Sequence, residues 1–69
     1  ALFREHAPFV WRSARRMGVP EEAVDDVVQD VFVVVAQRLD EFEGRAQVRT
    51  WLFAILVNVV RGQRRTTFR

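Results

Sequence analysis

Residues 21–42 read EEAVDDVVQDVFVVVAQRLDEF, and this stretch decides the fold. Its apolar residues recur every three or four positions, which is the period of one face of an α-helix. A strand over the valine run at residues 31–35 is the alternative, but the helical period extends beyond that run on both sides, and no second strand exists to pair with it. We therefore predict one long helix that starts after Pro20 and ends at Gly44. Its buried stripe would consist of Val24, Val27, Val28, Val31, Val34, Val35, Leu39 and Phe42.

A second helical segment precedes this one, over about residues 2–17. Pro8 lies inside it, and because a proline lacks a backbone donor and clashes with the preceding turn, we expect a kink or a restart there. Gly18 is expected to end the helix in the left-handed conformation. The apolar side of this segment would consist of Leu2, Phe3, Phe9, Val10, Ala14 and Met17.

A third helix is predicted over about residues 48–64, after the polar loop at residues 44–47. Gly62 marks a weak point near its end, and Phe53 falls off the apolar stripe, so that it either packs against the first helix or is exposed for stacking. The three stripes can share one core, which predicts an all-α protein, a compact three-helix bundle. The stripe of the third helix consists of Trp51, Leu52, Ile55, Leu56 and Val59.

Length and composition limit the class of protein. The chain has 69 residues, the size of one small domain or of a fragment. It contains no cysteine, which excludes disulfides and thiolate metal sites and fits a reducing compartment. No apolar run approaches the roughly 18 residues of a membrane helix, and the N-terminus shows no signal-peptide pattern. We expect a cytoplasmic location and no membrane partner.

Charged residues are sorted along the chain. Residues 21–43 hold eight carboxylates and one arginine, a net charge of −7, whereas residues 44–69 hold six arginines and no carboxylate, a net charge of +6. Residues 1–20 add four arginines and one glutamate, a net charge of +3. Such sorting predicts two faces of opposite sign, one for a basic protein surface and one for a polyanion such as nucleic acid.

Three motifs follow one another in the two longer helical segments. Asp26, Gln29 and Asp30 are spaced to share one helix face. A segment at residues 39–44 reads LDEFEG, and residues 50–52 read TWL, with Asn58 further along the same helix. In this order and at this spacing, the motifs resemble region 2 of bacterial RNA polymerase sigma factors of the sigma-70 family, in particular the extracytoplasmic-function (ECF) group. The HAP sequence at residues 6–8 is similar to the family's opening helix, so the resemblance covers essentially the whole chain.

The resemblance implies a function in transcription initiation. It implies that Asp26, Gln29 and Asp30 dock on the coiled-coil of the largest subunit of core RNA polymerase, where carboxylates make charge-assisted bonds to arginines. It also implies that the loop and the third helix hold the melted non-template strand of the promoter −10 element, with an anti-sigma factor as a further partner. The residues implied in DNA binding are Arg45, Arg49, Trp51, Asn58, Arg61, Arg64 and Arg65.

Each of these residues also has a structural interpretation. The acids and arginines are typical of a solvated helix face, Asn58 of an exposed helix position, and Trp51 of a core anchor. The chain departs from the family pattern at Ala46 and Gln47, where a serine is usual, and at Gly62, where a polar helix former is usual. We expect residues 1–69 to be a fragment, without the region 4 helix-turn-helix domain that reads the −35 element.

Other function classes fit less well. A helical protein-interaction module without DNA contact is the leading alternative, and a helix-turn-helix protein is disfavoured because that motif joins short helices by a tight turn. His6 and Ser13 form no oriented catalytic set, so we do not expect an enzyme. Asp25, Asp26 and Asp30 do not match a calcium loop, and we expect neither a metal nor a cofactor.

Overall fold

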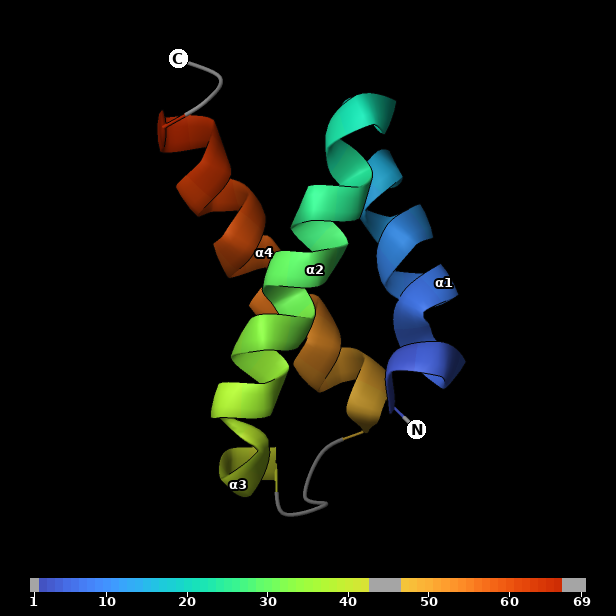
Figure 1. Ribbon diagram of the computed structural model, residues 1–69, viewed down its shortest axis with the longest axis vertical. Helices are drawn as coiled ribbons and strands as arrows, with labels where there is room; N and C mark the ends of the chain where they lie inside the picture. The colour runs from blue at the N-terminus through green and yellow to red at the C-terminus, as the bar shows by residue number, and fades with distance from the viewer. Residues whose placement is uncertain (1, 43–46, 67–69) are drawn as a thin grey trace.

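The computed structural model describes residues 2–42 and 47–66. These residues form four helices in the order α1 (Leu2–Arg16), α2 (Glu21–Gln37), α3 (Leu39–Phe42) and α4 (Val48–Thr66). Helices α1, α2 and α4 each contact the other two, while α3 is a single short turn beneath α2 (Figure 1). The predicted all-α three-helix bundle is confirmed for the described part of the chain.

Helix α1 runs through Pro8 without interruption, so the restart expected there does not occur. The missing donor of Pro8 would pair with the carbonyl of Arg4 in the first turn. Since Arg4 and Pro8 are both exposed, water can satisfy that carbonyl. The proline therefore costs one hydrogen bond near a helix end and leaves the helix continuous.

The turn after α1 confirms the predicted role of Gly18, whose φ is 93°. Its N–H donates to the Arg15 carbonyl at 3.0 Å, and the N–H of Val19 donates to the Ala14 carbonyl at 3.1 Å. This pair of bonds is the Schellman motif, in which a left-handed residue lets the chain satisfy the last carbonyls of a helix. The buried Val19 then returns to the core and directs α2 back along α1.

Helix α2 begins after Pro20 as predicted, with Glu21 and Glu22 in its first turn. It ends at Gln37, seven residues before the predicted end, so the expectation of one helix up to Gly44 is wrong. The N–H of Arg38 points at two carbonyls, of Val34 at 2.9 Å and Val35 at 3.3 Å, and the chain restarts as α3. As a result Leu39 leaves the predicted stripe and is 49% exposed.

Helix α4 continues through Gly62 to Thr66, so this glycine does not end it. The N–H of Trp51 donates to the carbonyl of Gln47 at 3.2 Å, which ties the start of the helix to the preceding residue. Gly44, Arg45 and Ala46 of the predicted loop lie outside the described residues. Among the described helices, none is long and apolar enough to cross a membrane.

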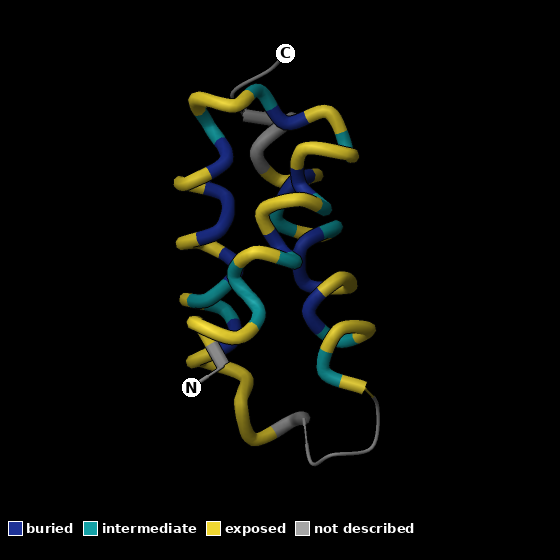
Figure 2. Tube along the Cα trace, turned by 90° about the vertical axis from the view of Figure 1, so that its right-hand side faces the viewer, coloured by how far each residue is buried: buried dark blue, intermediate teal, exposed yellow. Residues whose placement is uncertain are grey.

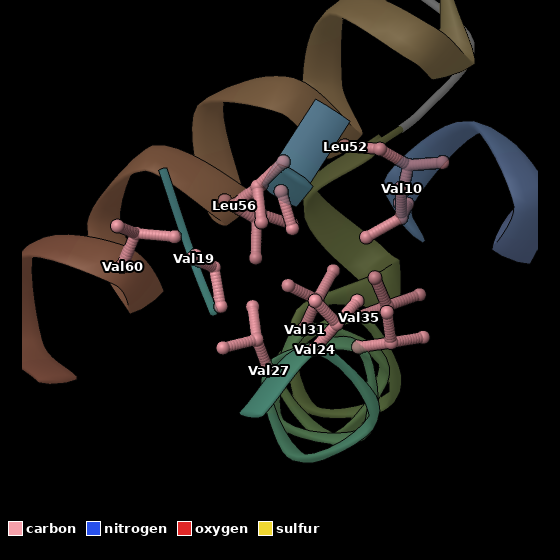
Figure 3. Close-up of a cluster of buried hydrophobic side chains, with 12 residues drawn as sticks. Val10, Val19, Val24, Val27, Val31, Val35, Leu52, Leu56 and Val60 are labelled. Carbon is pink, nitrogen blue, oxygen red and sulfur yellow. The ribbon is translucent and has the colours of Figure 1, made fainter. Parts of the chain in front are cut away.

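The core lies where α1, α2 and α4 meet, and buried residues face inward from all three (Figures 2 and 3). Two sequence assignments change. Phe3 is half-exposed and meets Phe32 edge to face at 5.0 Å between ring centroids, whereas Val60, absent from the predicted stripe, is buried. The buried cluster consists of Val10, Ala14, Val19, Val24, Val27, Val28, Val31, Val35, Leu52, Ile55, Leu56 and Val60.

Candidate functional site

The outer side of α2 carries the predicted acidic motif. Asp26, Gln29 and Asp30 are all exposed, while Val27, Val28 and Val31 between and beside them are buried. This alternation follows from the helical period, because the core fixes which side of α2 faces inward and the motif falls on the other side. The structure therefore brings the three predicted docking residues together on one accessible surface, which we name the acidic face.

Val33 belongs to the same surface and was not predicted as a site residue. It lies three residues after Asp30 and seven after Asp26, and its side chain is 54% exposed. The sequence did contain a signal, because Val33 is the one valine of the 31–35 run that lies on the opposite side of the helix from the buried stripe. An exposed apolar side chain thus lies beside the acidic face, one turn beyond Asp30.

The outer side of α4 carries part of the predicted DNA-binding set. Asn58 and Arg61 are exposed, and Asn58 lies two turns beyond Trp51 on the same side of the helix. The Trp51 side chain is half-buried and packs against the core, in agreement with its interpretation as a core anchor. The Phe53 side chain is 43% exposed, so of the two positions expected for it, the exposed one is observed.

Arg49 points away from that group. Nine residues separate it from Asn58, which at about 100° per residue places the two side chains on opposite sides of the helix. The guanidinium carbon of Arg49 lies 4.9 Å from the centroid of the Phe9 ring of α1, a cation–π contact. The predicted DNA-binding residues are therefore divided between two sides of α4.

Three predicted residues cannot be placed in the site. Arg45 lies outside the described residues. Arg64 and Arg65 occupy the last turns of α4, but their side chains lie outside the part of the molecule that the structure describes. Their roles remain predictions from the sequence.

Opposite charges occupy different helices. Helix α2 contains five carboxylates and no basic residue, whereas α4 contains four arginines and no carboxylate. Among the described residues, no group of three His, Asp or Glu side chains is arranged to hold a metal ion. The Nδ1 atom of His6 is buried without a hydrogen-bond partner, so it does not pair with Ser13.

The fold and its faces define an all-α domain with one acidic helix, α2, and with arginines on α1 and α4. Comparison with known families identifies the class further, since residues 2–68 match Sigma-70 region 2. The chain belongs to the sigma-70 region 2 family, whose members are parts of transcription factors and not enzymes.

Curated relatives agree with this assignment. The chain is 42% identical over 64 residues to the RNA polymerase sigma factor NccH of Alcaligenes xylosoxydans xylosoxydans, covering 93% of this chain and 34% of the relative. It is 43% identical over 60 residues to the sigma factor CnrH of Cupriavidus metallidurans, covering 87% of this chain and 31% of that protein. It is also 33% identical over 67 residues to the ECF sigma factor SigL of Mycobacterium tuberculosis, covering 96% of this chain and 38% of that protein. The chain thus spans about a third of the length of these relatives. No solved structure gave a significant match.

Proposed function

We propose that this domain binds core RNA polymerase and recognises the promoter −10 element as its strands separate. The observation that carries the proposal is the match to Sigma-70 region 2 over nearly the whole chain. The separation of acidic and basic residues onto α2 and α4 supports it, because the two partners carry opposite charge.

The acidic face is the proposed polymerase surface. Asp26, Gln29 and Asp30 would meet basic side chains on the coiled-coil of the largest polymerase subunit, where charge-assisted bonds fix orientation and Val33 adds apolar contact. Carboxylates along this helix also repel DNA phosphates. The same surface therefore favours a protein partner over nucleic acid.

Helix α4 is the proposed surface for the non-template strand. An Asn amide offers a donor and an acceptor to one base edge, and Asn58 stands exposed in the middle of the helix. Arg61 lies one turn further on, where it would neutralise a phosphate. The exposed part of Trp51 would support the edge of the melted segment, and the remaining contacts would come from Arg45, Arg49, Arg64 and Arg65.

In a complete sigma factor this domain would act together with a second domain that reads the −35 element. An anti-sigma factor would compete for the same surfaces as polymerase or promoter. The place of action would be the bacterial cytoplasm, where polymerase and chromosome lie together.

Titration of −10 oligonucleotides against the domain tests the DNA half of the proposal. We expect the non-template strand to bind more tightly than its complement, and Asn58→Ala to reduce that difference by about tenfold because one bidentate base contact contributes about 1–3 kcal/mol. Replacing Arg45, Arg49 and Arg61 with Ala should reduce the salt slope by about 2 log units if three phosphates are contacted. Equal affinity for both strands, with polymerase binding retained, would instead favour a protein-interaction module without DNA contact.

A further inference from the structure

Four arginines of α1 have no role in the proposed function. Arg4, Arg12, Arg15 and Arg16 are all exposed, and Glu5 is the one carboxylate of the helix. The side that carries Val10 and Ala14 is buried against α2 and α4. The outer side of α1 is thus a cationic surface, which we name the α1 basic face.

Three residues of the outer side of α1 form a row along the helix. At about 100° per residue, Arg4, Trp11 and Arg15 fall within about 40° of one another around the axis, with Arg12 to one side. The row is about 16 Å long at about 1.5 Å per residue. Since each strand of a duplex carries one phosphate per about 3.4 Å of axis, the row extends over about five base pairs.

One contact and one exposed donor suit the row to anionic groups. The Nη1 atom of Arg15 donates to the Val19 carbonyl at 2.8 Å, which holds that guanidinium at the end of the helix. Trp11 is 36% exposed between Arg4 and Arg15, and an indole N–H is a donor without an acceptor function. Both features favour phosphate oxygens over cations or neutral surfaces.

Arg49 extends the basic surface onto α4. It stacks on Phe9, and Phe9 shares its side of α1 with Arg12 and Arg16 at spacings of three and four residues. A cation from the first turn of α4 therefore lies beside the α1 basic face, on the side of α4 opposite Asn58.

We propose that the α1 basic face binds the phosphate backbone of double-stranded DNA. The inference rests on the proposed function in one respect, which is that α4 holds a melted strand. Such a strand continues covalently into duplex DNA on both sides. A rigid helix that carries four guanidinium groups on its outer surface suits the phosphates of a duplex, and the face contains no Asn or Gln to read bases. Contact would be independent of sequence and sensitive to salt.

Two variants with equal loss of charge test the assignment. The first is Arg4→Gln with Arg12→Gln and Arg16→Gln, which leaves Arg15 and its bond to Val19 in place. The second is Arg61→Gln with Arg64→Gln and Arg65→Gln on α4. Gln and Arg have similar helix propensities, so both variants should fold, and far-UV circular dichroism checks this. The probes are a scrambled-sequence duplex of about 20 base pairs, four times the length of the row, the −10 non-template oligonucleotide, and phosphatidylserine vesicles.

We expect the α1 variant to lose about tenfold in duplex affinity and about 2.7 log units of salt slope, at about 0.9 per phosphate. Its affinity for the single strand should stay within about twofold, whereas the α4 variant should show the reverse pattern. Replacement of the same α1 arginines with Lys should restore duplex binding.

An unchanged duplex affinity, or an equal loss of duplex affinity in both variants, overturns the inference. So does vesicle binding that the α1 variant abolishes while duplex binding persists. If the domain does not prefer the non-template strand but duplex binding still depends on the α1 arginines, the proposed function is contradicted and the inference about α1 is not.

Discussion

At the scale of single residues, Val33 is an apolar side chain surrounded by polar ones. It is 54% exposed and lies on the same side of α2 as Asp26 and Asp30. Interfaces commonly place an apolar centre inside a polar rim, where the centre contributes affinity and the rim contributes orientation. Val33, one turn beyond Asp30, would supply such apolar contact if the acidic face docks on a basic helical partner.

The substitution Val33→Asp distinguishes an electrostatic from an apolar contribution to polymerase docking. The substitution adds a carboxylate to the acidic face, so purely electrostatic docking would become tighter. We expect core RNA polymerase to bind about tenfold more weakly, because burial of a valine contributes about 1.5 kcal/mol or more. Stability should change by less than about 0.5 kcal/mol, since the position is exposed and the two residues have similar helix propensities. Surface-bound polymerase and a thermal melt measure the two quantities, and tighter binding would contradict the expectation.

Arg49 and Phe53 show where sequence reasoning ends at this scale. Helical spacing placed Phe53 off the buried stripe but could not tell whether another helix covers it. The resemblance to sigma region 2 assigned Arg49 to the DNA-binding set, yet its contact is with Phe9, forty residues earlier in the chain. Contacts of this kind depend on how two helices pack, and no local pattern encodes them. The exposure of Asp26, Gln29 and Asp30 was predictable, because one helical period determines both the buried side of α2 and the side opposite to it.

At the scale of elements, the positions of helices were more predictable than their interruptions. The stripe that includes Val35 continues in register to Leu39 and Phe42, and no glycine or proline lies between them. Periodicity therefore predicted a single helix, although the chain ends α2 at Gln37 and starts α3 at Leu39. Pro8 led to the opposite error, because a restart was predicted where the helix is continuous. A proline near a helix start removes only a bond to a carbonyl that water can reach.

Two glycines provide a matched test of the helix ends. Gly62 lies inside α4, and a methyl group added there meets no atom within 4 Å apart from the neighbouring residues and backbone of its own helix, so Gly62→Ala should stabilise the domain by about 0.5–1 kcal/mol. Gly18 has a φ of 93°, and Gly18→Ala should destabilise it by about 1 kcal/mol because a side chain strains that conformation. Urea unfolding followed by circular dichroism measures both. Opposite signs support the helix boundaries, and a destabilising Gly62→Ala would contradict the continuity of α4.

At the scale of the whole molecule, three helices present three kinds of outer surface. The core takes one side of α1, α2 and α4, and the exposed residues of each helix lie on the outside of the bundle (Figure 2). The exposed carboxylates of α2 and the arginines of α1 and α4 belong to different helices. Under the proposed function, a basic protein and an acidic polymer would each meet a different helix of this small bundle.

This separation predicts that polymerase binding and DNA binding can be lost independently. Asp26→Arg with Asp30→Arg should weaken core polymerase binding by about tenfold, because charges on a docking face are reversed against a basic partner. Glu21→Arg with Asp25→Arg is the matched control, with the same charge change at the same spacing on another side of α2. Both variants raise the net charge equally, so any general gain in affinity for the non-template strand should be equal too. Equal loss of polymerase binding in both would show that total charge, and not the acidic face, directs the domain to polymerase.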